Sequence, residues 1–286
     1  MMQKVKRGDT MQGLKIITLM EDNLCGEGLV SEHGLSVYIE TKKHKLLVDT
    51  GQSDKTLQNA AVMGVDLTQV DTVVLSHGHY DHSGGLLAFA AINPTADIYM
   101  RECADGEYYA FKEGAERYIG IDKAISKLPK LHLTKGDVVI DEELSLFTDI
   151  EAVRPIPRGN SRLHERQGEE YVQDSFAHEQ YLVIQYEAGR YALISGCAHK
   201  GILNIIDAFR KLYHKDPDIV VSGFHMVLPE YTEADLAEIR AAAEELAGMD
   251  TEFYTGHCTG DVAMSILKET LGPKLWSLGD GVRGSK

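Results

Sequence analysis

At 286 residues, the chain is long enough for one large domain or two small ones. Hydrophobic residues make up 43% and charged residues 26%, which is ordinary for a globular protein, and no apolar run approaches the roughly 20 residues of a membrane helix. The formal net charge of −15 argues against nucleic acid or an anionic membrane as a partner, and it suits a site whose acidic groups bind cations.

The cysteine content indicates a reducing compartment. Cys25, Cys103, Cys197 and Cys258 lie far apart, form no C-x-x-C pair and are too few for a disulfide scaffold. No secretory signal is recognisable at the N-terminus. We therefore expect a cytoplasmic enzyme with reduced thiols.

In the first third of the chain, short apolar runs alternate with stretches of helical spacing. Residues 1–12 carry no clear period and are expected to form a loose segment, followed by a single domain over residues 13–286. The patterns predict strands at Lys15–Met20, Leu35–Glu40, Lys45–Val48, Val70–Leu75 and Ile98–Met100, and helices at Ser53–Met63 and Leu86–Ile92.

The middle of the chain is less regular. Aromatic residues gather between positions 103 and 129, and Tyr108 among them is expected either to pack in the core or to line a substrate pocket. Residues 151–180 are predicted to form an irregular insert, because prolines and glycines interrupt any period. This insert is either a solvated loop or a lid whose arginines, such as Arg158, bind an anionic substrate. Between these stretches, a meander of short strands is predicted at Leu131–Thr134, Val138–Ile140 and Leu144–Thr148.

Regular periodicity returns in the last third. A hairpin is predicted from Tyr181–Tyr186 and Arg190–Ile194, and Leu275–Leu278 closes the pattern. Helical spacing that alternates with short apolar runs is typical of α/β folds. It predicts helices at Ile202–Tyr213, Glu233–Ala247 and Val262–Leu271, and strands at Ile219–Val221 and Glu252–Tyr254.

The most specific pattern is an H-x-H-x-D-H motif that follows the strand predicted at Val70–Leu75. Imidazole and carboxylate groups are common ligands of zinc and similar divalent metals. If the chain is extended there, His77 and His79 project to one side, whereas the adjacent Asp81 and His82 point in different directions. This geometry suggests two neighbouring metals. The alternative is a chance cluster of solvated histidines, which shuffling would produce in roughly one or two chains per thousand.

Three further histidines follow predicted strands in glycine-containing turns. They are His199, His225 and His257. Ligands of open α/β sheets bind at the carboxyl ends of strands, so strands that share a sheet would bring these side chains to one edge. His33, just before another strand, is either a surface residue or part of the rim of the site.

These motifs resemble those of the metallo-β-lactamase superfamily of metal-dependent hydrolases. The resemblance rests on H-x-H-x-D-H, on Asp49-Thr50-Gly51 upstream and on a Gly-His turn near the C-terminus. The segments Ser195–Gly201 and Thr255–Gly260 resemble a branch typified by dihydropterin-ribofuranosylaminobenzene phosphate synthase. The resemblance implies a four-layer αβ/βα sandwich with the site along one edge of two facing sheets.

The resemblance also implies a site for up to two divalent metals, with zinc favoured over iron or manganese. His77 and His79 would bind one metal, and Asp81, His82 and His257 the second. The remaining assignments concern positions where this chain departs from the superfamily or leaves a choice. Asp49 would support the cluster, Cys197 stands where a bridging Asp is common, and the third ligand of the first metal is either His199, which we favour, or His178.

The implied activity is hydrolysis, in which a metal-bound hydroxide attacks a phosphoryl or acyl centre of a small, anionic substrate. Asp81 would orient the water or carry its proton, and His225 would steady the substrate. Two alternatives remain open: a pterin and ribose-phosphate transferase like the synthase of the same branch, and a sensor that retains metal without catalysis.

Overall fold

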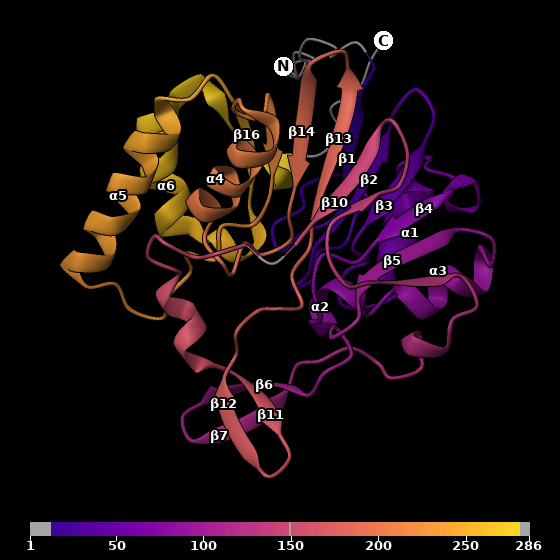
Figure 1. The fold of residues 1–286 in the computed structure, drawn as a ribbon, viewed down its shortest axis with the longest axis horizontal. Helices are drawn as coiled ribbons and strands as arrows, with labels where there is room; N and C mark the ends of the chain where they lie inside the picture. Colours follow the sequence, from indigo (N-terminus) through magenta and orange to yellow (C-terminus); the bar gives the residue numbers. More distant parts are fainter. Residues whose placement is uncertain (1–12, 149, 281–286) are drawn as a thin grey trace.

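Two β-sheets lie face to face in the computed structural model, which describes residues 13–148 and 150–280 (Figure 1). The first sheet is antiparallel at one end and parallel at the other. Its order is β1 (Lys15–Met20), β2 (Ser36–Glu40), β3 (Lys45–Val48), β4 (Thr72–Val74), β5 (Asp97–Arg101) and β8 (Leu131–Thr134).

The second sheet has the same mixed character. Its first four strands run parallel and its last four are joined antiparallel. The order is β17 (Leu275–Ser277), β16 (Glu252–Thr255), β15 (Ile219–Val221), β14 (Arg190–Ile194), β13 (Tyr181–Glu187), β10 (Leu144–Phe147) and β9 (Val138–Val139).

Helices cover the outer face of each sheet. The helices beside the first sheet are α1 (Lys55–Val62), the short α2 (Tyr80–Ser83) and α3 (Leu86–Ile92). Those beside the second are α4 (Ile202–Tyr213), α5 (Glu233–Ala247) and α6 (Asp261–Leu271). Short 3-10 turns occur at Leu67–Gln69, Ile125–Lys127, His257–Thr259, Gly272–Lys274 and Leu278–Asp280.

Three apolar clusters hold the four layers together. One lies between the sheets, where Val37 and Val48 face Leu182 and Ile194. A second joins the second sheet to α4, α5 and α6, and a third joins the first sheet to α1 and α3. Strands covered on both faces must be apolar throughout, which is why β15 reads Ile-Val-Val. The result is the αβ/βα sandwich that the resemblance implied.

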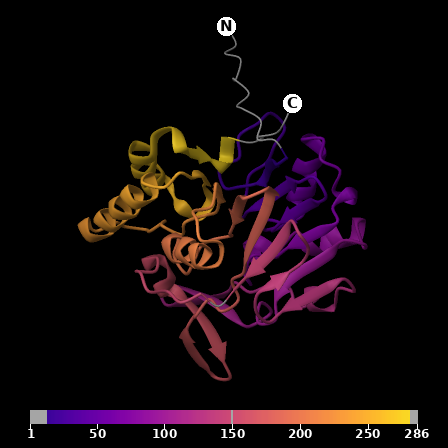
Figure 2. The same ribbon diagram turned by 45° about the horizontal axis from the view of Figure 1, so that its top comes forward.

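A small antiparallel sheet projects from the sandwich (Figures 1 and 2). It contains β12 (Glu170–Gln173), β11 (Leu163–Gln167), β6 (Tyr108–Lys112) and β7 (Ala115–Tyr118), and η3 (Arg158–Arg162) precedes β11. The irregular insert predicted at residues 151–180 therefore contains a hairpin. Its two-residue turn is built on Gly168, which has a φ of 65°.

The predicted meander is wrong. β8 pairs in parallel with β5 of the first sheet, whereas β9 and β10 pair with each other in the second sheet. Short alternating runs predict that strands exist but do not identify their partners. The loose segment predicted at residues 1–12 lies outside the described residues. No helix in the two described ranges is both long and apolar enough to cross a bilayer.

Candidate metal centre

The candidate ligands converge because they all follow the carboxyl ends of parallel strands. β4 leads into the His77-Gly78-His79 segment, and the short helix α2 follows at once and carries Asp81 and His82. The second sheet supplies the remaining groups across the same edge. Cys197 and His199 follow β14, His225 follows β15 and His257 follows β16.

One group of ligands consists of His77, His79 and His199. The candidate ligand atoms of these three buried residues all lie within 4.8 Å of one another. Their Nε2 atoms are buried and have no hydrogen-bond partner within the described residues. The Nδ1 atom of His77 lies 2.8 Å from the Ser76 hydroxyl, and that of His199 donates to the Asn160 amide oxygen at 2.9 Å. These contacts leave Nε2 available as the ligand atom.

A second group surrounds Asp81. Its Oδ2 atom lies 3.6 Å from His82 Nε2 and 3.4 Å from His257 Nε2. Each histidine is oriented from its other ring nitrogen, since His82 Nδ1 contacts Asp49 at 2.6 Å and His257 Nδ1 contacts Asp22 at 2.6 Å. Asp49 thus contacts His82 on the side of the ring away from Asp81.

Cys197 lies between the two groups. Its Sγ atom is 3.1 Å from His82 Nε2, and it shares one potential ligand set with His77 and another with His257 and Cys258. The thiol therefore occupies a position from which it can reach either group, where the resemblance leads one to expect a bridging carboxylate.

The electrostatics of the first group favour neutral imidazoles, whereas burial raises the pKa of the Cys197 thiol. Burial alone would lower the pKa of His257, but Cys258, Asp22 and Asp81 raise it. Burial lowers the pKa of His77, His79 and His199, and neighbouring histidines lower it further. The pKa of His79 falls to about 3. Burial alone would raise the pKa of Asp81, but His82 and His257 outweigh it and hold it below its ordinary value. Neutral imidazoles with free Nε2 atoms, a carboxylate and a thiol form a donor set that fits a divalent metal such as zinc.

His178 is placed to orient the motif. Its Nδ1 atom accepts a hydrogen bond from the backbone N–H of Gly78 at 3.1 Å, and its Nε2 atom lies 3.1 Å from Asp174. Because both ring nitrogens are engaged, the geometry favours His199 over His178 as the third member of the first group.

Two residues considered for the substrate pocket do not line the cavity over the centre. Tyr108 is buried, donates its hydroxyl to the Cys103 carbonyl at 2.6 Å and lies tilted against the His178 ring, with the centroids 4.2 Å apart. Arg158 is held by Asp235 through two hydrogen bonds of 2.6 and 2.8 Å. Tyr108 therefore packs in the core, which was one of its two expected positions, and Arg158 lines a neighbouring cavity instead of the one over the centre.

The cavity over the centre has a volume of about 220 Å³. His33 lies at its rim, 2.9 Å from Asp22 and 3.5 Å from Asp81. The small sheet supplies the opposite wall, and three basic residues in and beside it line the cavity: Lys112, Arg117 and Arg162.

Several supporting residues were missed by the sequence reasoning. Asp22 contacts both His33 and His257, Asn160 contacts His199, and Glu179 accepts the backbone N–H of His199 at 2.7 Å. Asp22 had a detectable signal, because it follows β1 just as Asp49 follows β3. Asn160 had none, since it lies in the segment predicted to be irregular.

The fold and this centre define a class of protein, and sequence comparison identifies the same class. Residues 31–244 match the Metallo-beta-lactamase superfamily, and the chain belongs to that superfamily. A solved metal-dependent hydrolase of the beta-lactamase superfamily is 29% identical and superposes with a TM-score of 0.77, covering 92% of this chain and 95% of the other. The Bacillus subtilis metallo-beta-lactamase fold protein YhfI shares the fold at 14% identity and a TM-score of 0.53, covering 93% and 96%.

Two curated relatives come from Methanocaldococcus jannaschii. One is an uncharacterised protein, 29% identical over 89% of this chain and 94% of its own length. The other is 7,8-dihydropterin-6-methyl-4-(beta-D-ribofuranosyl)-aminobenzene-5'-phosphate synthase, 27% identical over 91% of this chain and 92% of its own length.

Proposed function

We propose that the protein is a metal-dependent hydrolase that acts on a small, anionic phosphoryl or acyl substrate. The observation that carries the proposal is the pair of adjacent ligand groups, one around His77 and one around Asp81, at the base of a cavity. Similarity to a metal-dependent hydrolase over nearly the whole chain supports the same reaction class.

In this proposal two metals, with zinc favoured, share the centre. His77, His79 and His199 hold the first, Asp81, His82 and His257 hold the second, and Cys197 contributes to one or both. When bound, such cations supply a nucleophile from water at neutral pH and stabilise negative charge on the reacting oxygen.

The protein's own residues position the reactants. Asp81 stays ionised because of His82 and His257, so its carboxylate can orient an attacking water and accept its proton. His225 is buried beside His199, with ring centroids 4.2 Å apart, and its ring lines the cavity. It can therefore donate a hydrogen bond to the substrate.

The preference for an anion rests on the cavity wall. Lys112, Arg117 and Arg162 face the cavity, although the whole chain is strongly acidic. Local positive charge in an otherwise negative molecule attracts an anion to this wall. Guanidinium groups also match the geometry of phosphate and carboxylate oxygens.

The test is hydrolysis of a panel of phosphomonoesters, phosphodiesters, carboxylic esters and lactones by protein of measured metal content. We expect turnover with at least one class, loss of at least 100-fold with His79→Ala, and a raised KM with Arg162→Ala. Elemental analysis of protein purified without added metal identifies the metal. Equal rates for wild type and His79→Ala on every substrate would refute the proposal.

A second candidate is a transferase that joins a pterin to a phosphorylated ribosyl compound, because the synthase from Methanocaldococcus jannaschii aligns with 91% of this chain. It predicts calorimetric binding of reduced pterins and of ribose 5-phosphate. A metal-retaining sensor predicts ligand binding without turnover on any panel member. The cytoplasmic location expected from the cysteine content stays a prediction.

A further inference from the structure

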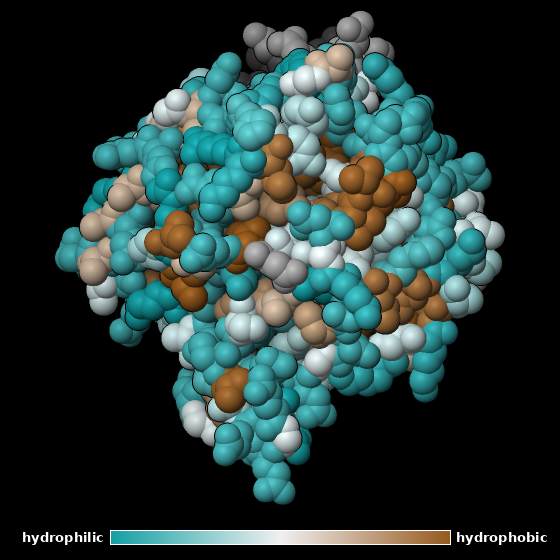
Figure 3. All heavy atoms as spheres, viewed as in Figure 1, coloured by the Kyte–Doolittle hydropathy of each residue, from teal (hydrophilic) through white to brown (hydrophobic). Residues whose placement is uncertain are grey.

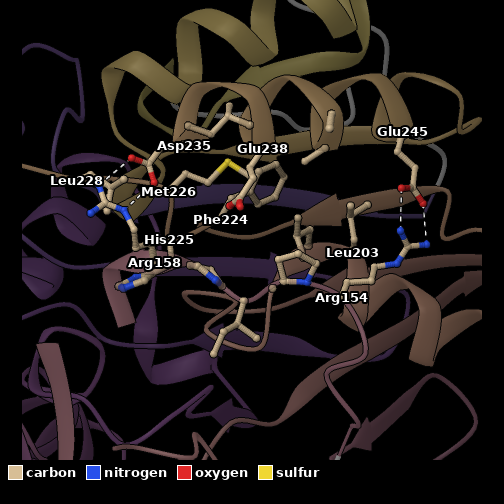
Figure 4. Close-up of a pocket in the computed structure, with 18 residues that line it drawn as sticks. Arg154, Arg158, Leu203, Phe224, His225, Met226, Leu228, Asp235, Glu238 and Glu245 are labelled. Carbon is tan, nitrogen blue, oxygen red and sulfur yellow. Dashed lines mark hydrogen bonds and ion pairs between the residues drawn. The ribbon is translucent and has the colours of Figure 1, made fainter. Parts of the chain in front are cut away.

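A second cavity, of about 270 Å³, lies beside the metal centre. Its walls are the start of α4, one face of α5 and the segment that precedes η3 (Figure 4). Apolar side chains dominate the lining, which includes Ile156, Leu203, Phe224, Met226, Leu228 and Ile239. Apolar lining in a concave site is typical of a pocket for a small ligand.

Both arginines of this cavity are already paired with carboxylates, and the lining also includes Glu238. Arg154 contacts Asp207 at 2.5 Å and Glu245 at 2.8 Å, and Arg158 is held on both sides of its guanidinium by Asp235. Figure 4 shows the Arg154–Glu245 and Arg158–Asp235 pairs at opposite ends of the cavity. A charged ligand group would have to break such a pair to bind here, whereas hydrocarbon would gain from leaving water. The cavity therefore suits the apolar part of a ligand.

Residues 224–228 separate this cavity from the metal centre. Phe224, Met226 and Leu228 line the apolar cavity, Val227 lines the metal cavity, and His225 lines both. His225 is only 6% exposed, and its ring nitrogens form no hydrogen bond of good geometry within the described residues, although the Cys258 thiol lies close enough for a weak one. A buried imidazole that is so weakly satisfied gains from a ligand that hydrogen-bonds it.

Gly159 faces His225 and leaves room for about one methyl group beside the ring. A methyl group there would lie 3.4 Å from His225 Nε2 and 3.4 Å from the Val227 carbonyl oxygen. The outer margin of the cavity is also apolar, since Ile156 is 44% exposed and nearby Val153 is 66% exposed. Figure 3 shows several separate hydrophobic groups on a largely hydrophilic face, one of them on the side of α5.

We propose that the two cavities bind one amphiphilic substrate. Its anionic, reacting group lies at the metal centre, its alkyl or aromatic portion fills the apolar cavity, and His225 hydrogen-bonds the polar group where the two portions join. This assignment of a substrate class rests on the proposed hydrolase function, but the binding that it predicts can be measured without turnover.

The test is calorimetric binding of n-alkylphosphonates, which are not hydrolysed, to metal-loaded, full-length protein. For wild type we expect affinity to rise about fourfold with each methylene from ethyl- to octylphosphonate, until the cavity is full. Ala242→Phe and Ala241→Phe add a ring to the lining face of α5. They should remove the dependence on chain length and leave ethylphosphonate affinity unchanged.

Ala237→Phe is the matched control, because Ala237 is exposed on the same helix and does not line the cavity. It should retain the wild-type series. Three outcomes would overturn the proposal. They are equal affinity of wild type for ethyl- and octylphosphonate, an unchanged dependence on chain length in both lining variants, and no binding of any alkylphosphonate. Absence of hydrolysis with a chain-length series intact would overturn only the proposed reaction.

Discussion

Asp22 connects two histidines of the metal centre through a single carboxylate. One of its oxygens contacts His257 Nδ1 at 2.6 Å and the other contacts His33 Nδ1 at 2.9 Å. Burial alone would raise the pKa of Asp22, but the two imidazoles outweigh it and hold the carboxyl ionised. An ionised partner on Nδ1 fixes the ring so that Nε2 faces Asp81, and it strengthens Nε2 as a ligand.

Removing this support should weaken binding of the second metal, held by Asp81, His82 and His257, more than binding of the first. For Asp22→Ala we expect a loss of about 10- to 100-fold in affinity for one metal equivalent, with the other retained. Titration against a chromophoric chelator measures both. Asp250→Ala, at an exposed position, should match wild type. If Asp22→Ala binds both metal equivalents with wild-type affinity, His257 needs no such support.

Cys197 can be tested as a ligand by its spectrum. Its Sγ atom lies 3.1 Å from His82 Nε2, close to both ligand groups. Substitution of cobalt for the native metal should give near-ultraviolet charge-transfer absorption from a cobalt–thiolate bond. Cys197→Ser should lose this band, whereas Cys25→Ser, at an exposed thiol, should keep it. A band that persists in Cys197→Ser would assign the thiolate to Cys258.

At the scale of elements, helix α5 illustrates local encoding. Thr232 caps its N-terminus by accepting the backbone N–H of Asp235, and the Asp235 carboxylate accepts the Thr232 backbone N–H at 2.7 Å. The same carboxylate pairs with Arg158, so the cap also fixes one end of the apolar cavity.

Thr232→Ala should therefore lower the free energy of unfolding by about 1 kcal/mol, because it leaves helix-end N–H groups unsatisfied. Urea denaturation of metal-loaded protein measures the change. Thr270→Ala, at an exposed position near the end of α6, should stay within about 0.5 kcal/mol of wild type. Equal stability of Thr232→Ala and wild type would show that water replaces the cap without loss.

Elements with a local signal were predictable, and those defined by distant partners were not. The helices α3 and α4 begin and end where apolar spacing predicts, and the hairpin of β13 and β14 also forms. The parallel pairing of β8 with β5 depends on contacts across the fold that no short pattern contains. The same distinction explains the site. H-x-H-x-D-H is local, whereas the contact of His178 with Gly78 and that of Arg158 with Asp235 join remote segments.

At the scale of the whole molecule, the two sheets are also joined away from the metal centre. His44 directly precedes β3 of the first sheet. Its Nδ1 atom lies 2.7 Å from Asp71, just before β4 of the same sheet, and its Nε2 atom lies 2.6 Å from Asp141, just before β10 of the second sheet. The carboxylates are anchored in turn, since Asp71 accepts the Lys45 N–H and Asp141 accepts that of Leu144. Protonated His44 thus bridges two acidic groups from different layers.

This bridge should make stability depend on pH. Burial lowers the pKa of His44, but the hydrogen bonds from Asp71 and Asp141 raise it more, so the folded-state pKa exceeds the ordinary value. The stabilisation is then fully present below about pH 6.5, the unfolded-state pKa, and is lost as pH rises through the folded-state pKa. Its size should be about 1 kcal/mol or less, because the carboxylates are partly exposed.

Urea denaturation of metal-loaded protein across pH 6 to 9 tests the bridge, since bound metal keeps the site histidines from titrating. His44→Gln should be less stable than wild type at pH 6, and the difference should disappear toward pH 9. Asp141→Asn should reduce the same pH-dependent difference, because it removes one of the two charges that raise the pKa. If wild type and His44→Gln differ by the same free energy of unfolding at every pH, His44 joins the sheets by packing alone and its charge contributes nothing.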